Sequence, residues 1–527
     1  MRPMGFLVIV LLMVSGGFAT GAEPVEADIL LVGGTIHDGT GAKPVVGDVA
    51  IMGDRIVAVG KFKTKSAEWR LDCTGLVVMP GAIDLHNHSD RQVVDPRTRA
   101  SINYLMQGCT TMVTGNCGSG PVDVGDYYEK INQAGAGTNV IHLLPHGSLR
   151  RAVVGSESRA ATAGELEEMQ GLAEKAMAEG AWGMSTGLIY VPGTYADTNE
   201  LVTLAKVVAR HKGIYASHIR NENVRLLAAV DEAMEIGRKA GLPVHVSHFK
   251  SSGRGSWGLV RRAAKMIAVA RKTGQKVTAD QYPYIASSTS LDATVIPTWA
   301  RAGGRKELIR RLDDKEIGLK LRTAIAENLS RKENGQVLKI ARYAPRPDWV
   351  GQSVAEIAES EKLTTVEVAV EVARSGGAAI VNFSMSEEDV RYIMQVPWVA
   401  TASDGRAYLP GADRPHPRSY GTFARKLGHY AIREQVLGLA AAVRSMTGLP
   451  AEILGLKDRG VLRAGTVADV AVFDPKAIRD AATFEDPHQY SEGFRYVLVN
   501  GRPAVFRGKP TGALAGRAVV HGREPAK

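Results

Sequence analysis

The sequence predicts an α/β fold in which a (β/α)8 barrel of the TIM type carries a small β domain. Three observations support this prediction. The middle of the chain, residues 78–440, alternates short apolar runs with stretches of helical periodicity, which is the pattern of βα units. Both ends of the chain are rich in short strand-like runs and turn residues. A chain of 527 residues is long enough for one barrel and a second, smaller unit.

Eight apolar runs are candidates for the barrel strands. They are Val77–Leu85, Thr110–Thr114, Val140–Leu144, Trp182–Thr186, Gly213–Ser217, Pro243–Ser247, Lys276–Asp280 and Trp398–Ser403. Ala378–Phe383 is a further strand-like run that competes with Lys276–Asp280 for the seventh place in the barrel. The sequence alone leaves both assignments open.

The two ends of the chain are expected to form one composite β-sandwich domain from residues 23–77 and 441–527. Turn signals such as Gly53-Asp54 and Asn500-Gly501 lie between short apolar runs in both segments. The barrel then occupies residues 78–440. A polar, charged stretch at about 287–345 is expected to be an insertion after the seventh strand.

Residues 1–22 have the composition of a secretory signal peptide. Arg2 supplies a positive charge, Phe6–Val14 an apolar core, and Thr20-Gly21-Ala22 small residues for cleavage. The apolar core is too short for a comfortable transmembrane helix. We therefore expect export, to a periplasm, with no stable membrane insertion of the mature chain.

Charge and cysteine content exclude two classes of protein. The formal net charge of +10 is spread along the chain rather than clustered, so there is no nucleic-acid footprint. The three cysteines are too few, and odd in number, for an exported domain stabilised by disulfides. The expected partner is a small-molecule substrate.

Metal-ligating side chains gather at the carboxyl ends of the predicted strands, where barrel enzymes keep their chemistry. The first strand ends in a His-x-His pair, whose two imidazoles project to the same side of the chain. Other strand ends supply a cysteine, two histidines and an aspartate. The candidate set is His86, His88, Cys117, His218, His248 and Asp404. Nitrogen, thiolate and carboxylate ligands of this kind suit zinc.

The motifs around these residues resemble those of the D-aminoacylase (N-acyl-D-amino-acid deacylase) family of the amidohydrolase superfamily. The resemblance covers nearly the whole mature chain. It rests on Pro80-Gly81-Ala-Ile-Asp-Leu-His-Asn-His, Gly115-Asn116-Cys117-Gly118, Ser217-His218-Ile-Arg220-Asn-Glu222, Ser247-His248-Phe-Lys250, Tyr282-Pro283-Tyr284, Ser403-Asp404-Gly405 and His416-Pro417-Arg418-Ser-Tyr420-Gly421-Thr422-Phe423. It implies a zinc-dependent hydrolase that cleaves the amide bond of N-acyl-D-amino acids.

The resemblance also implies how the metal is held. One zinc is expected to bind tightly to Cys117, His218 and His248. His86 and His88, with Cys117 and Asp404, are expected to line a second, weaker position. Many relatives in the superfamily bridge two metals with a carboxylated lysine from the fourth strand, but here that strand ends in Met184-Ser185-Thr186-Gly187-Leu188. The cysteine is therefore expected to take the bridging place.

Two further roles complete the expected site. Asp404, at the end of the last strand, is the natural proton shuttle between the attacking water and the leaving amine. The free carboxylate of an N-acyl amino acid needs a cationic partner. The resemblance places substrate contacts at Lys250, Tyr282, Ser288 and Arg418. Arg220 is an alternative, unless it forms an internal ion pair with Glu222.

Three other functions remain as alternatives to deacylation. One is a cyclic-amide hydrolase of the dihydropyrimidinase or dihydroorotase type, which the missing fourth-strand lysine disfavours. Another is an exported hydrolase of dipeptides that contain D-amino acids. A third is a binding protein built on a decayed barrel, which the complete ligand set disfavours. The sequence does not specify the acyl group, the amino-acid side chain or the oligomeric state.

Overall fold

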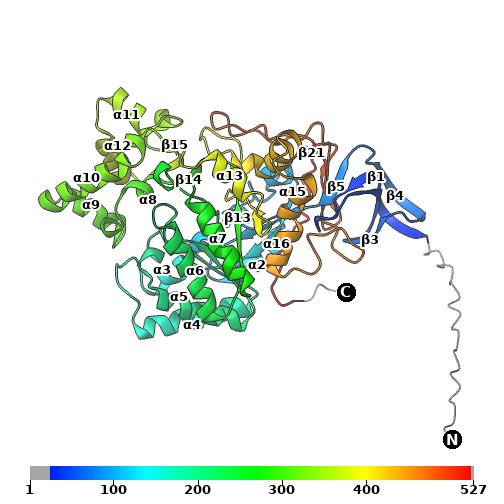
Figure 1. Cartoon of the computed structure of the whole chain (residues 1–527), viewed down its shortest axis with the longest axis horizontal. Coiled ribbons are helices and arrows are strands. Elements are labelled where there is room, and N and C mark those ends of the chain that lie inside the picture. The colour runs from blue at the N-terminus through cyan, green and yellow to red at the C-terminus, as the bar shows by residue number, and fades with distance from the viewer. Residues whose placement is uncertain (1–23, 524–527) are drawn as a thin grey trace, which may run out of the picture.

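The computed structural model describes residues 24–523 and confirms the α/β barrel fold (Figure 1). Parallel strands form the barrel at its centre. In chain order they are β6 (Ala82–Asp84), β7 (Cys109–Thr114), β8 (Asn139–His142) with its continuation β9 (Leu144–Pro145), β10 (Gly183–Gly187), β11 (Ile214–His218), β12 (Val244–Val246), β13 (Val277–Gln281) and β17 (Val399–Thr401). The expected signal peptide, residues 1–22, lies outside the described residues.

The barrel closes where its last strand meets its first. The backbone N–H of Asp404 donates to the carbonyl of His86 over 2.8 Å, and that of His88 donates to the carbonyl of Gly405, also over 2.8 Å. At the third position, β8 pairs with β7 and β9 pairs with β10, so β8 and β9 act as two halves of one barrel strand. Closure therefore brings the ends of β6 and β17 together.

Helices surround the barrel. They are α1 (Ile102–Leu105), α2 (Val124–Ala134), α3 (His146–Val153), α4 (Ala163–Ala178), α5 (Thr198–Arg210), α6 (Leu226–Ala240), α7 (Leu259–Lys272), α13 (Glu387–Ile393), α14 (Arg418–Ala424), η7 (Arg425–Arg433), α15 (Leu439–Met446) and α16 (Gly448–Leu454). Helix α5 shows why they form: Asp197 accepts a hydrogen bond from the Glu200 N–H at 2.7 Å as its N-cap, and Leu201, Leu204 and Val208 form a buried stripe at helical spacing.

Within residues 24–523, no helix is both long enough and apolar enough to span a membrane.

Strands from both ends of the chain form one nine-stranded sheet on one side of the barrel (Figure 1). They are β1 (Val25–Ile36), β2 (Val45–Met52), β3 (Arg55–Gly60), β4 (Thr64–Asp72), β5 (Val77–Pro80), β18 (Val470–Phe473), β19 (Phe494–Val499), β20 (Arg502–Phe506) and β21 (Lys509–Pro510). β5 pairs antiparallel with β18, which joins the two chain ends directly. Side chains from both halves of the sheet share one apolar cluster.

The expected single strand Val77–Leu85 is wrong, because the chain changes sheet at Gly81. β5 belongs to the nine-stranded sheet, and β6 begins the barrel. The Gly81 N–H donates to the Asp469 carbonyl at 2.8 Å, and the Ala82 N–H donates to the Gly108 carbonyl at 2.9 Å, so the hydrogen-bonding partner switches within two residues. A Cβ at Gly81 would lie 2.2 Å from Oγ1 of Thr110, so only glycine fits at this crossing.

The insertion after the seventh strand is longer than the expected 287–345, and we call residues 287–382 the inserted module. Its strands β14 (Ser287–Ser290), β15 (Leu338–Arg342) and β16 (Ala379–Asn382) form an antiparallel sheet. Its helices are α8 (Leu291–Val295), α9 (Arg305–Asp313), α10 (Lys315–Ser330), α11 (Val354–Glu361) and α12 (Thr365–Arg374), which project from the barrel in Figure 1. The module has its own apolar cluster, to which strand and helix residues both contribute.

The inserted module also decides the seventh barrel strand. β13 pairs in parallel with β12 and β17, which places Lys276–Asp280 in the barrel. The competing run, Ala378–Phe383, forms β16 and pairs antiparallel with β14 and β15. The sequence was ambiguous because both runs are strand-like and it does not show their partners. One strand pairs in parallel within the barrel, and the other pairs antiparallel within the module.

We expect Gly81→Ala to destabilise the protein by about 1–3 kcal/mol, because the added methyl group overlaps the buried Thr110 side chain. The double variant Gly81→Ala/Thr110→Ala should recover part of that loss, because it removes Oγ1 and Cγ2 of Thr110, at 2.2 and 2.3 Å, and leaves its Cβ at 2.7 Å. Gly164→Ala is the matched control, since a Cβ there meets open space on a helix. Thermal unfolding measures all three. Equal stability of the single and double variants would contradict the steric explanation.

Candidate metal centre and active site

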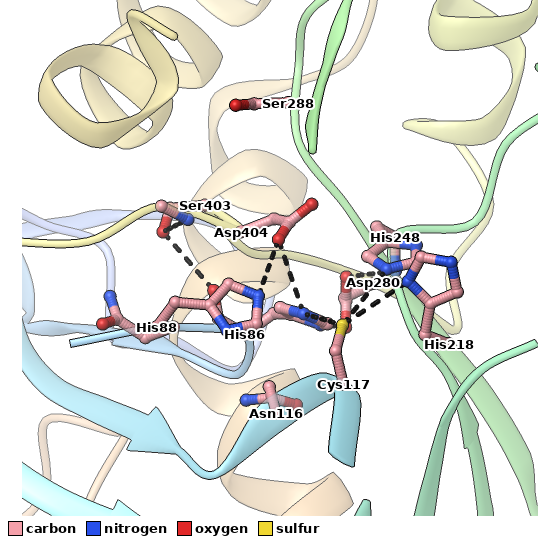
Figure 2. Close-up of polar contacts among 12 residues, drawn as sticks. His86, His88, Asn116, Cys117, His218, His248, Asp280, Ser288, Ser403 and Asp404 are labelled. Atoms are coloured by element: carbon pink, nitrogen blue, oxygen red, sulfur yellow. Dashed lines mark hydrogen bonds and ion pairs between the residues drawn. The ribbon is translucent and has the colours of Figure 1, made fainter. Parts of the chain in front are cut away.

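The Cys117 thiol lies at the centre of the predicted ligand set (Figure 2). Its Sγ atom is 3.3 Å from Nε2 of His86, 3.5 Å from Nδ1 of His218 and 3.6 Å from Nε2 of His248. The same Nε2 atom of His86 lies 3.5 Å from Oδ1 of Asp404, which is also 3.1 Å from Nε2 of His88. All six predicted metal-site residues therefore converge at one end of the barrel.

The backbone at three of these residues is held in an uncommon conformation. Cys117, His248 and Asp404 have φ angles of +51°, +37° and +52°, in the left-handed region that side-chain-bearing residues rarely adopt. Gly115 precedes the cysteine at φ +78°, and a Cβ there would lie 2.0 Å from the Leu143 carbonyl oxygen. Such local strain is concentrated at functional sites, where the surrounding structure enforces it.

The spacing of the donors fits zinc. Zn–S bonds of about 2.3 Å and Zn–N bonds of about 2.0–2.1 Å, at a tetrahedral angle, place sulfur and nitrogen about 3.5 Å apart. The three sulfur-to-nitrogen distances at Cys117, 3.3 to 3.6 Å, match this value. In addition, the buried Nε2 atom of His218 has no hydrogen-bond partner among the described residues.

The ionisation of Cys117 favours a cation as well. Burial opposes loss of the thiol proton, but the facing imidazoles of His86 and His218 hold the pKa of this thiol well below its usual range. A thiolate is the form of cysteine that binds metal. The sulfur lies within ligand distance of imidazoles from both predicted metal positions, which supports its expected bridging place between them.

Asp280 is a site residue that the sequence reasoning did not select. Its Oδ2 atom lies 2.8 Å from Nε2 of His245 and 3.5 Å from Nδ1 of His86, and its Oδ1 atom accepts the backbone N–H of His248 at 2.7 Å. One buried carboxylate thus orients two metal-ligand residues, the role that outer carboxylates play at zinc sites. The sequence signal that could have identified Asp280 is its position at the carboxyl end of barrel strand β13.

Glu222 is the second residue that was not selected. Its Oε1 atom lies 2.8 Å from Nδ1 of His248 and accepts a hydrogen bond from the Lys250 ammonium at 2.6 Å. Burial raises the pKa of this carboxyl, but Lys250 and His248 more than compensate and hold it well below its usual value. The suggested Arg220–Glu222 pair is wrong: Arg220 pairs with Glu232 at 2.9 Å, because helix α6 brings Glu232 to it.

Asp404 is held ionised and oriented. Its Oδ2 atom forms an ion pair with Nη1 of Arg418 at 2.8 Å, which leaves Oδ1 facing His88 and His86. Burial raises the pKa of this carboxyl, yet Arg418 and His86 together hold it well below its usual range. A carboxylate in this state can accept a proton.

The site opens into a cavity of about 940 Å³, which both the barrel loops and the inserted module line. Lys250, Tyr282, Ser288 and Arg418, the predicted substrate contacts, all line it. The guanidinium of Arg418 lies 4.6 Å from the Tyr282 ring centroid, and its Nη2 atom donates to the Ser288 carbonyl at 3.5 Å. The Tyr282 hydroxyl is buried and has no hydrogen-bond partner within residues 24–523, so it is available to a ligand.

Tyr190 also lines the cavity and was not predicted. Its ring packs edge-on against His218 with centroids 5.0 Å apart, and its hydroxyl lies 3.1 Å from Oγ1 of Thr289 in the inserted module. It therefore links a metal ligand to the module. Tyr190 lies shortly after the fourth barrel strand, β10, and is not part of any motif recognised in the sequence.

Comparison with known proteins agrees with this geometry. A family model described as the amidohydrolase family matches residues 71–505. A D-aminoacylase from Alcaligenes xylosoxydans xylosoxydans is 35% identical, over 94% of this chain and 97% of that protein. The chain belongs to the D-aminoacylase family of amidohydrolases. An N-acyl-D-glutamate deacylase of the same organism, another protein of this group, is also 35% identical, over 93% of this chain and 96% of the relative.

A solved structure extends the comparison to the metal. The N-acyl-D-glutamate deacylase of Bordetella bronchiseptica, complexed with zinc and a phosphonate inhibitor, superposes with a TM-score of 0.81 at 33% identity. The match covers 94% of this chain and 99% of that one. Together with the donor spacing at Cys117, it confirms zinc as the expected cofactor and a metal-dependent amidohydrolase as the class of enzyme.

Variants of Cys117 and His86 should differ in how much zinc they lose. Because Cys117 is within ligand distance of imidazoles at both, Cys117→Ser should weaken zinc binding by at least about 100-fold and abolish activity. His86→Ala should lose activity while keeping most of its zinc. Metal analysis after gel filtration measures zinc per chain. Cys73→Ala, at a buried thiol in the β domain, is the matched control. Equal zinc loss in the Cys117 and His86 variants would contradict the division.

Proposed function

We propose that this protein hydrolyses the amide bond of N-acyl-D-amino acids and releases a carboxylate and a free D-amino acid. The observation that carries the proposal is the combination of a thiolate-centred zinc site, a carboxylate oriented toward it, and a cationic wall beside that carboxylate. Family membership supports the D-amino-acid class of substrate, since the relatives described above are D-aminoacylase and N-acyl-D-glutamate deacylase.

The site residues divide the work of hydrolysis. When bound, zinc supplies Lewis acidity, which polarises a carbonyl and makes water a better nucleophile at neutral pH. Asp404 presents Oδ1 to the metal side of the cavity, so it can take the proton of the attacking water there. The same oxygen can then deliver the proton to the nitrogen of the leaving amine. Arg418 fixes the other oxygen and so keeps the carboxylate in one orientation.

The substrate carboxylate needs a cationic, hydrogen-bonding partner near the reacting bond. We propose that Arg418 and Tyr282 provide it, with Ser288 at the edge of the inserted module. The Tyr282 hydroxyl is buried and unpartnered among the residues described, and burial raises its pKa to about 12, so it stays protonated and donates. Lys250 contributes charge 5.6 Å from the Tyr282 ring centroid, but Glu222 and the His248 carbonyl already occupy its ammonium.

The cyclic-amide alternative has less support from this site. Strand β10 (Gly183–Gly187) ends at the barrel mouth without a lysine, so the carboxylated lysine of that type of centre has no counterpart on it. The Cys117 sulfur occupies the position between the two ligand groups instead. The arrangement therefore favours linear amides.

The purified zinc enzyme should hydrolyse N-acetyl-D-amino acids at least about 100-fold faster than the L-enantiomers, hydantoin or D-dipeptides. Asp404→Asn should lower kcat by about 10²–10⁴-fold, because the positioned proton acceptor is lost, while zinc content stays unchanged. Ninhydrin detection of the released amine measures turnover.

The exposed residue Asp126 provides the control Asp126→Asn, on helix α2, which should retain full activity. Near-normal turnover by the Asp404 variant would remove this residue from the mechanism. A preference for hydantoin would instead replace the proposed reaction.

We further propose that the chain is exported to a periplasm and acts there, on the strength of the signal-like residues 1–22. Cleavage after Ala22 should leave a mature chain that begins at Glu23, which N-terminal sequencing of the periplasmic fraction would detect. The variant Ile9→Arg/Leu12→Arg breaks the apolar core and should leave full-length protein in the cytoplasm. Recovery of the wild type as an uncleaved cytoplasmic protein would contradict the proposal.

A further inference from the structure

Lys332 lines the active-site cavity from the inserted module, far in sequence from every motif of the barrel. It follows helix α10, and the next three residues, Glu333, Asn334 and Gly335, have φ angles of +51°, +51° and +89°. Two consecutive non-glycine residues in the left-handed region are costly, so the surrounding structure must enforce this turn. The conformation of the backbone beside Lys332 is therefore specific.

The turn contacts the barrel through an exposed ion pair. Glu333 pairs with Nε of Arg254 at 2.7 Å, and Arg254 lies in the segment between β12 and α7 that also contains His248. In the same loop, the Gly253 N–H donates to the carbonyl of Ser384 at 2.7 Å, just beyond the end of the module. Lys332 is thus held over the side of the cavity that Glu222 and Lys250 occupy.

The ammonium of Lys332 lacks a direct partner among the residues described. Lys250 is paired with Glu222, and Arg418 is paired with Asp404. No ion pair or side-chain hydrogen bond is found for Lys332 within residues 24–523. Its side chain is only partly exposed, and burial lowers its pKa while the carboxylate of Glu222 opposes that shift. A partly desolvated cation without a partner favours an anion supplied from outside.

The rest of the cavity wall also favours an anionic ligand. Six lysines and arginines line it against three aspartates and glutamates: Arg151, Lys250, Lys332, Arg342, Arg406 and Arg418 against Glu222, Asp292 and Asp404. Serines and threonines are numerous on the wall as well. The excess of cationic side chains attracts anions to the cavity.

We propose that Lys332 binds a second carboxylate of the substrate, so that the enzyme acts on N-acyl-D-amino acids that are dicarboxylates. This inference rests on the proposed deacylation and names its substrate class. Arg418 and Tyr282 hold the carboxylate next to the scissile amide, and Lys332 holds the second one across the cavity. The second carboxylate can belong to the amino-acid side chain, as in glutamate, or to the acyl group, as in succinyl.

Lys332→Met tests the proposal, because it removes the charge and keeps the length of the side chain. Two substrate pairs differ only by a carboxylate: N-acetyl-D-glutamate with N-acetyl-D-glutamine, and N-succinyl-D-alanine with N-butyryl-D-alanine. Wild-type enzyme should prefer the acid of at least one pair. The variant should lose about 10- to 100-fold in kcat/KM on that acid, mainly through KM, and change less than about threefold on its neutral partner.

Lys332→Arg should restore most of the loss, since it keeps a cation at the same place. Lys306→Met, at an exposed lysine of the same module, is the matched control and should behave as the wild type. Sensitivity confined to the glutamate pair identifies the side-chain carboxylate, and sensitivity confined to the succinyl pair identifies the acyl carboxylate. Both results support the proposal.

An equal loss on acid and neutral substrates in Lys332→Met, or an unchanged preference for the acid, would overturn the role of Lys332 and leave deacylation intact. A wild-type enzyme that prefers the neutral member of both pairs would overturn it as well. Absence of turnover on all four substrates by the zinc-loaded wild type would overturn the proposed function together with this inference.

Discussion

The closure of the barrel through one buried carboxylate is the constraint on which the site depends. Asp84 accepts hydrogen bonds from the Ser403 N–H at 2.8 Å, the Ser403 hydroxyl at 2.5 Å and the Asn87 amide at 2.8 Å. It lies in the first barrel strand, and Ser403 follows the last. This contact holds Asp404 beside His86 and His88, although more than 300 residues separate them in the chain. Without closure, the proton acceptor and the metal ligands would have no fixed separation.

The remaining charges of the site are buried in pairs. Glu222 lies between Lys250 and His248, Asp280 between His245 and His86, and Asp404 next to Arg418. An isolated charge at such depth would be neutralised or would destabilise the fold, whereas a hydrogen-bonded pair is tolerated. The pairs leave the atoms that ligands need: the Cys117 sulfur, Oδ1 of Asp404 and the Tyr282 hydroxyl. The same charge pairs therefore stabilise the fold and keep the ligand-binding atoms of the site free.

The inserted module adds a second wall to the cavity of the barrel. The barrel strands supply the metal ligands and the proton acceptor, which any amide substrate requires. The module supplies Ser288, Thr289 and Lys332, which lie on the wall where a substrate's distal groups must fit. Because the module has its own apolar core, its cavity wall can vary without disturbing the barrel. The proposed substrate contacts of the module and the candidate metal ligands of the barrel thus lie in separately stabilised parts of the chain.

The sequence by itself determined the barrel and the family, and it selected six candidate metal-site residues that the fold brings together, because strand periodicity and strand-end motifs are local signals. It did not determine that the chain changes sheet at Gly81, since β5 and β6 read as one apolar run and only their partners differ. Nor did it assign Ala378–Phe383 to the module, because burial by α8–α12 and burial by barrel helices produce the same apolar pattern. Asp280, Glu222, Tyr190 and Lys332 gain their roles only from contacts between distant segments. The sequence specifies the chemistry of each side chain, but the packing of the whole chain decides which side chains that residue contacts.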